Sequence, residues 1–171
     1  YRRNIISLVD TARSKGAIPI ICSPINRIIF EPDGTLRNLL GAYRDAAKDA
    51  AESCGVCFID LWERTTDYFV KAGPVKSWQF FRCKDDQRDY THTNDIGGTM
   101  IAKFFAQEMI KQNGPMAEYI DKTIIDVKQI YADEGDKVDN DDIIAHSKSI
   151  GLVNVPDDFD ADITGLQIGK N

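Results

Sequence analysis

The sequence lacks several features that would point to common classes of partner. No apolar run approaches the roughly 20 residues that a membrane-spanning helix needs, so a membrane is not an expected partner. The net charge is -6, and this acidic balance argues against nucleic acid as the main partner. Histidine occurs only twice, at His92 and His146, and the apolar neighbours of His146 favour a structural role for it over that of a ligand.

The four cysteines do not form a recognisable metal site. Cys54 and Cys57 have CxxC spacing, but no second CxxC or CxxH follows to complete a zinc site. The pair is expected where a helix ends and a strand begins, so it lacks the helix N-terminus that lowers a thiol pKa in redox motifs. We therefore interpret the cysteines as small apolar residues or one disulfide, and we predict no metal and no cofactor.

The charge is divided unevenly along the chain. Residues 1–113 contain 16 Lys and Arg against 14 Asp and Glu, a net +2, whereas residues 114–171 have a net charge of -8. The composition changes at the turn signal Asn113-Gly114-Pro115. We expect a folded region at 1–113 and an acidic extension at 114–171 that is helical at first and then irregular. Segments 133–144 and 158–162 resemble the calcium loops of dockerin modules, but neither keeps the required ligand spacing.

Helical and strand patterns alternate through residues 1–113. Apolar spacing predicts helices over 2–15, 43–53, 61–72 and 96–111, with Gly73-Pro74 ending the third and Asn94 or Asp95 capping the fourth. Continuous apolar runs at 17–22 and 56–60 predict buried parallel strands. This pattern is typical of an α/β fold with a parallel sheet. Two strands cannot form such a sheet alone, so we expect the second half of a larger α/β domain.

The segment Asp89-Tyr90-Thr91-His92 carries the clearest chemistry, in a charged loop just before the last helix. Serine hydrolases need an imidazole as general base and a carboxylate to orient it. Asp89 and His92 are therefore the candidate catalytic pair. The alternative is a surface loop whose Asp and His only cap the next helix.

Other polar and aromatic residues allow two interpretations. Asn26 and Arg27 follow the first strand at its carboxyl end, where ligands of α/β proteins bind. They are candidates for substrate binding, with Arg27 suited to a carboxylate, although arginine–carbonyl bonds that only hold the loop are the alternative. Trp78, Phe80 and Phe81 are predicted to be core residues rather than a surface on which a sugar ring stacks.

Taken together, residues 1–112 resemble the later part of SGNH (GDSL-type) hydrolases, in the branch similar to rhamnogalacturonan acetylesterases. The residues that carry the resemblance are 12–19, 23–27, 34–36, 41–43, 55–61, 89–92 and Gly97.

The resemblance implies a flavodoxin-like three-layer αβα sandwich and metal-free serine ester hydrolysis that removes acetyl groups from pectic polysaccharide. It implies that His92 is the general base and Asp89 its orienting carboxylate, and it favours a secreted or cell-surface location. The family's Gly-Asp-Ser nucleophile segment and its oxyanion-hole residues have no counterpart in this sequence. We therefore expect the chain to need the missing N-terminal half of the domain as a partner, and to be inactive without it. The alternative is a non-catalytic binding or assembly module with a vestigial Asp-His pair.

Overall fold

A computed structural model describes residues 1–84 and 87–122 of the chain. In chain order the elements are α1 (Arg2–Ser14), β1 (Ile20–Cys22), α2 (Gly41–Cys54), β2 (Cys57–Ile59), α3 (Leu61–Ser77), the 3₁₀ turn η1 (Trp78–Phe80), β3 (Phe81–Lys84), β4 (Gln87–Thr93), α4 (Asp95–Lys111) and the 3₁₀ turn η2 (Ala117–Tyr119). No helix in the described part of the chain is long and apolar enough to span a membrane.

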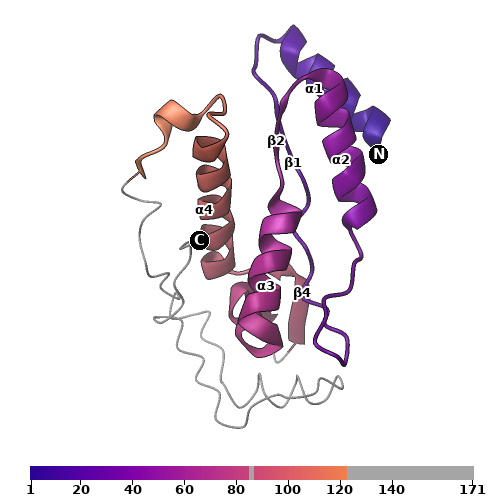
Figure 1. Cartoon of the computed structure of the whole chain (residues 1–171), viewed down its shortest axis with the longest axis vertical. Helices are drawn as coiled ribbons and strands as arrows, with labels where there is room; N and C mark the ends of the chain where they lie inside the picture. Colours follow the sequence, from indigo (N-terminus) through magenta and orange to yellow (C-terminus); the bar gives the residue numbers. More distant parts are fainter. Residues whose placement is uncertain (85–86, 123–171) are drawn as a thin grey trace.

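Strands β1 and β2 form a small parallel sheet, in which Ile21 pairs with Phe58 and Cys22 with Ile59. The predicted βα alternation is thus confirmed as a mixed α/β arrangement. Figure 1 shows the two strands between the α1–α2 pair and α4. The run at 17–22 is less buried than its composition predicts, because the strand begins only at Ile20 and Ile18 is 73% exposed.

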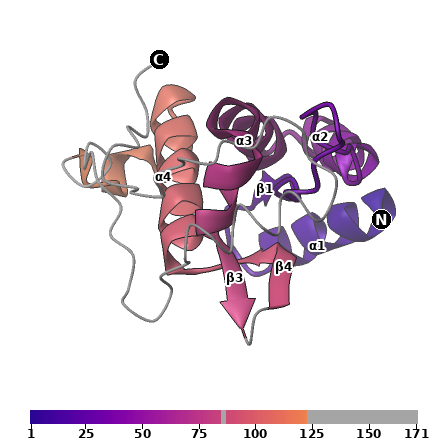
Figure 2. The ribbon, with the colours of Figure 1, turned by 90° about the horizontal axis from the view of Figure 1, so that it is seen from below.

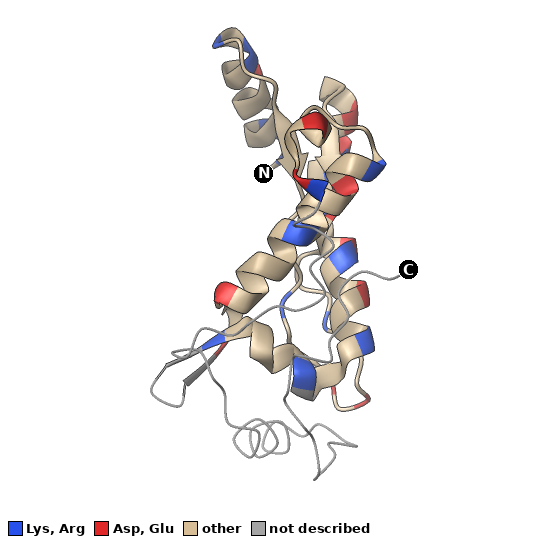
Figure 3. Cartoon of the chain, turned by 90° about the vertical axis from the view of Figure 1, so that its left-hand side faces the viewer, with Lys and Arg blue, Asp and Glu red and all other residues tan. Residues whose placement is uncertain are grey.

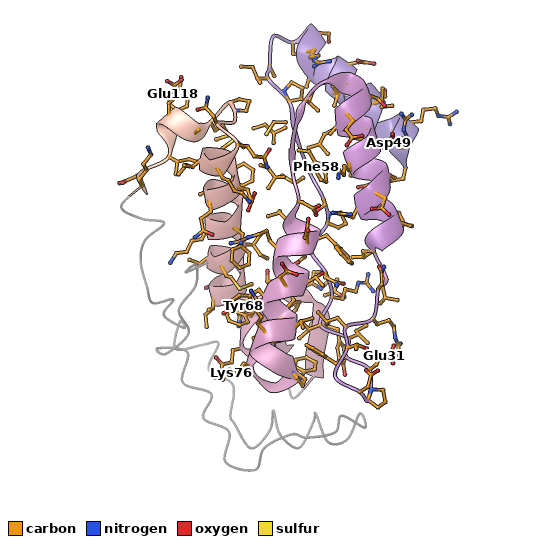
Figure 4. The ribbon with its side chains drawn as sticks, in the orientation of Figure 1. Glu31, Asp49, Phe58, Tyr68, Lys76 and Glu118 are labelled. Atoms are coloured by element: carbon orange, nitrogen blue, oxygen red, sulfur yellow. The ribbon has the colours of Figure 1, made fainter. Side chains whose placement is uncertain are left out.

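Alternate side chains of the strands enter two separate hydrophobic clusters. Ile21 packs with buried residues of α1 and α2, and Phe58 lies against this cluster (Figure 4). Ile59 belongs to the larger cluster, which is formed mainly by α3, η1 and α4. Because successive residues of a strand point to opposite faces, helices cover both faces of this short sheet.

The larger cluster is rich in aromatic rings. Trp78, Phe80 and Phe81 are each 2% exposed or less, which confirms that they belong to the core. Tyr68 lies edge-on against Phe80 at 5.4 Å between ring centroids, on the side of α3 toward α4 (Figure 4). Its burial there raises the pKa of the Tyr68 hydroxyl well above the ordinary value.

Two glycines end helices as the sequence indicates. Gly55 adopts a left-handed conformation with φ of 60° after α2, and the Val56 N–H then donates to the Ala51 carbonyl. Gly73 has φ of 77° and ψ of 170°, so the helical conformation stops before Pro74 and resumes after it. The predicted break at Gly73-Pro74 is therefore confirmed, although helix continues to Ser77.

The prediction of a charged loop before the last helix was wrong in part. Strands β3 and β4 form an antiparallel hairpin that projects beyond the helices (Figure 2). Asp89 and His92 consequently lie on strand β4 rather than in a loop. Alternation is masked here by charged residues and by a shift of register between Phe81 and Cys83, so the sequence shows no period-2 signal.

Basic and acidic residues are interspersed over the described helices (Figure 3). Cys22, Cys54 and Cys57 are free thiols. The extension after residue 122, with His146 and the two acidic segments, lies outside the described residues.

Candidate active site

The site is built from the end of β4, where Asp89 and His92 meet. The Nδ1 atom of His92 lies 2.6 Å from Oδ2 of Asp89. Residues three apart on a regular strand point to opposite faces, so this contact requires a local bend. The other carboxylate oxygen, Oδ1, produces it by accepting the backbone N–H groups of Thr91 at 2.8 Å and His92 at 2.9 Å.

These bonds also set the charge of the pair. Partial desolvation raises the pKa of Asp89, but the hydrogen bonds from the His92 and Thr91 amides and from the His92 ring outweigh it. The net pKa of Asp89 lies below its ordinary value, so the carboxylate is ionised at neutral pH. An ionised carboxylate accepts the Nδ1–H of a neutral imidazole, and that tautomer has its lone pair on Nε2.

The Nε2 atom is open to a reacting group. The His92 side chain is 70% exposed, and Nε2 has no hydrogen-bond partner among the described residues. The arrangement can therefore accept a proton from a hydroxyl placed at hydrogen-bond distance. No serine within residues 1–84 and 87–122 hydrogen-bonds to His92.

Contacts with neighbouring elements hold β4 on both sides of His92. The Tyr90 carbonyl accepts the Ile28 N–H at 3.4 Å, and the Tyr90 ring lies edge-on to Trp78 at 4.8 Å. On the other side, Asn94 is buried and caps α4 by accepting the Gly97 N–H at 3.0 Å. The cap was expected from the sequence, but the contacts of Tyr90 were not, because they join segments far apart in the chain.

Asn26 and Arg27 lie on the loop after β1. Asn26 is only 1% exposed; its Nδ2 donates to the Thr66 hydroxyl at 2.9 Å and its Oδ1 accepts the Arg27 N–H at 2.9 Å. Its polar atoms therefore hold the loop against α3. Arg27 is half-buried, and its Nε is buried without a hydrogen-bond partner within the described part of the chain. The following residue, Ile28, connects this loop to Tyr90.

A second polar group joins the carboxyl end of β2 to two helices. Arg44 of α2 donates to Oδ2 of Asp60 at 2.8 and 2.5 Å, and its guanidinium lies 5.8 Å from the Trp62 ring centroid. Asp60 also accepts the Glu63 N–H at 3.1 Å, and Ser23 accepts the Trp62 N–H at 2.7 Å. Desolvation raises the pKa of Asp60, but the bonds from Arg44 and Glu63 lower it by more. The net pKa of Asp60 therefore lies below its ordinary value. Sequence reasoning did not identify this group, which fixes the start of α3.

Among the described residues, no three His, Cys, Asp or Glu side chains lie close enough together to hold a metal ion.

Comparison with known proteins relates the chain to two proteins of Bacillus subtilis strain 168. The chain is 30% identical over 122 residues to a probable rhamnogalacturonan acetylesterase, YesY, and 28% identical over 129 residues to the rhamnogalacturonan acetylesterase RhgT. The matches cover 71% and 70% of this chain and 56% of each relative, so the chain spans about half the length of these curated relatives. No family model and no solved structure matches. Over about 70% of its length, the chain is therefore similar to curated rhamnogalacturonan acetylesterases, which supports the SGNH-type acetylesterase relationship that the sequence predicts for part of the chain.

Proposed function

We propose that this chain supplies the Asp-His pair of a serine esterase that removes acetyl groups from a rhamnogalacturonan-like polysaccharide. The observation that carries the proposal is the 2.6 Å contact between His92 Nδ1 and Asp89 Oδ2, with Nε2 left open. The names of the two relatives support the reaction and the class of substrate. Asp89 and His92 belong together chemically because the carboxylate fixes the tautomer that makes Nε2 basic.

In the complete site, a serine hydroxyl attacks the carbonyl carbon of the acetyl ester. His92 Nε2 takes the hydroxyl proton as the Ser Oγ–C bond forms, and Asp89 stabilises the resulting imidazolium. The same proton passes from Nε2 to the sugar oxygen when the acetyl C–O bond breaks. Water then attacks the acyl carbon while His92 Nε2 removes its proton. That proton passes to the serine Oγ as the Oγ–C bond breaks, which releases acetate and regenerates the serine. No cofactor takes part in these reaction steps.

The serine and the oxyanion donors come from the N-terminal half of the same domain, which is the partner we propose for this chain. In this arrangement residues 1–113 form the C-terminal part of a three-layer αβα sandwich, and residues 114–171 are an acidic extension. Two observations support it. Helices cover both faces of the β1–β2 sheet, and in the described part of the chain β1 pairs with β2 alone. The chain also spans only 56% of each relative.

Arg27 is the residue that we propose for binding an acidic sugar of the substrate. Arg27 is half-buried, and the terminal Nη atoms of a guanidinium can form a bidentate pair with a carboxylate. Asn26 then contributes to substrate binding by holding the Arg27 backbone through its Oδ1. A polysaccharide substrate also supports a secreted or cell-surface location for the protein.

The experiment joins this chain in frame to the N-terminal segment of the domain and measures acetate release from acetylated rhamnogalacturonan. We expect His92→Ala to abolish release almost completely, by about 10⁴-fold or more. The matched control is His146→Ala, which alters the other histidine of the chain and should leave release unchanged. Undiminished release by His92→Ala would refute the proposal.

The rival function is a non-catalytic module in which the pair is vestigial. The observation that favours it is the lack of any serine bonded to His92 among the described residues. The two functions differ in what lies upstream of the chain in its gene. An in-frame Gly-Asp-Ser segment supports the esterase, and a joined protein that binds the polysaccharide without releasing acetate supports the module.

A further inference from the structure

We propose that Asn94 is the positioning residue of the Asp-His pair, and that it orients His92 by joining the end of β4 to η1. This inference rests on the proposed function for its role in catalysis, but its structural content can be tested separately. Asn94 lies two residues after His92 and is 6% exposed, whereas the His92 side chain is 70% exposed. Packing around the ring is therefore too sparse to hold it against Asp89, so the contact depends on the course of the backbone.

Asn94 makes more bonds than a helix cap requires. Its Oδ1 accepts the Gly97 N–H at 3.0 Å, which is the capping bond. Its Nδ2 donates to the Gln79 carbonyl at 2.8 Å, and its backbone N–H donates to the Phe80 carbonyl at 3.1 Å. These last two bonds are made outside α4. They connect the end of β4 to η1, in which Gln79 lies 15 residues earlier in the chain than Asn94.

These contacts restrict the backbone of β4 between Tyr90 and Asn94. Tyr90 is held by Ile28 and Trp78, and Asn94 is held by η1, with His92 midway between them. The His92 N–H must reach Oδ1 of Asp89 for the local bend to form, and the ring must reach Oδ2 at the same time. A change in backbone direction at Asn94 would alter both contacts together, since only one residue separates it from His92.

The test measures the His92 ring proton by NMR on the 171-residue chain. A proton on Nδ1 that is held by a carboxylate gives a strongly downfield resonance, which is lost when the contact breaks and the proton exchanges with water. Asn94→Asp keeps an acceptor for the Gly97 N–H but removes the bonds that Nδ2 donates to the Gln79 and Phe81 carbonyls, and Asn94→Ala removes all three side-chain bonds. The matched control is Asn38→Ala, because Asn38 Oδ1 accepts the Gly41 N–H at 2.8 Å at the start of α2.

We expect the resonance in the unaltered chain and in Asn38→Ala, and its loss in both Asn94 variants. Its absence from the unaltered chain, or its persistence at the same position in Asn94→Asp, would overturn the inference. Asn94→Asp keeps the capping bond, so this variant alone decides the test if Asn94→Ala does not fold.

In the joined enzyme, Asn94→Asp should lower kcat by about 10- to 100-fold with KM unchanged, because misplacement of the base affects the chemical step. An unchanged kcat beside an inactive His92→Ala variant would overturn the inference and leave the proposed function intact. Activity that survives His92→Ala would refute the proposed function and leave the NMR result standing.

Discussion

Replacing Gly97 by alanine tests how closely α4 must approach η1. A Cβ atom at Gly97 would lie 2.1 Å from the Phe80 carbonyl oxygen and 2.9 Å from Cβ of Thr93. Because the nearest of these atoms belongs to the backbone of Phe80, either α4 or η1 must shift. Overpacking of this kind lowers the free energy of unfolding by about 1–3 kcal/mol. The shift also weakens the Asn94 cap, at a cost of about 1 kcal/mol. Alanine gains about 1 kcal/mol over glycine in helix propensity, which leaves a net loss of about 1–3 kcal/mol.

Gly98 is the matched control on the same helical turn. A Cβ atom there meets no heavy atom within 4 Å, so Gly98→Ala should stabilise the chain by up to about 1 kcal/mol. Urea unfolding followed by circular dichroism gives the free energy of unfolding for both variants. A Gly97→Ala variant as stable as Gly98→Ala would refute the close approach, and with it the support that η1 gives to Asn94.

The Arg44–Asp60 pair provides two more predictions. Both side chains are about one-fifth exposed, so Arg44→Met should lower the free energy of unfolding by about 1–2 kcal/mol, less than for a fully buried pair. Arg37→Met, which breaks the exposed pair with Glu31, should change it little; equal losses in the two urea titrations would contradict this ranking. Because the folded pKa of Asp60 is lowered, its stabilising effect is complete above the unfolded pKa of about 3.9 and is lost as the pH falls through the folded value. Unfolding measured from about pH 6 to about pH 2 should show a weaker acid dependence in Asp60→Asn, and an identical dependence would contradict the assignment.

The sequence predicts the helices and the two parallel strands because their signals are local. Apolar spacing gives α1 to within one residue of its end, and Asn94 marks the start of α4 by its capping chemistry. The break at Gly73-Pro74 follows from backbone restrictions of those two residue types. The exposure of Ile18 could not be predicted, because an apolar run does not reveal which neighbouring strands are present to cover it.

The candidate site is predicted in composition but not in geometry. The spacing of Asp89 and His92 identifies the pair, yet a strand would place them on opposite faces. The bend that joins them depends on the carboxylate accepting two backbone N–H groups, and no periodicity in the sequence reports it. The support from Tyr90 and Trp78 is equally hidden, because it joins segments 12 residues apart through tertiary packing.

The central claim is that Asp89 and His92 act as one unit in ester hydrolysis. Its most direct test is a double-mutant cycle in the joined enzyme, which measures kcat/KM for acetate release by His92→Ala, Asp89→Ala and the variant with both changes. Residues that act as a unit give non-additive losses, so the double variant should be no worse than His92→Ala alone. Losses that add in free energy, or a His92→Ala variant that retains full activity, would contradict the account.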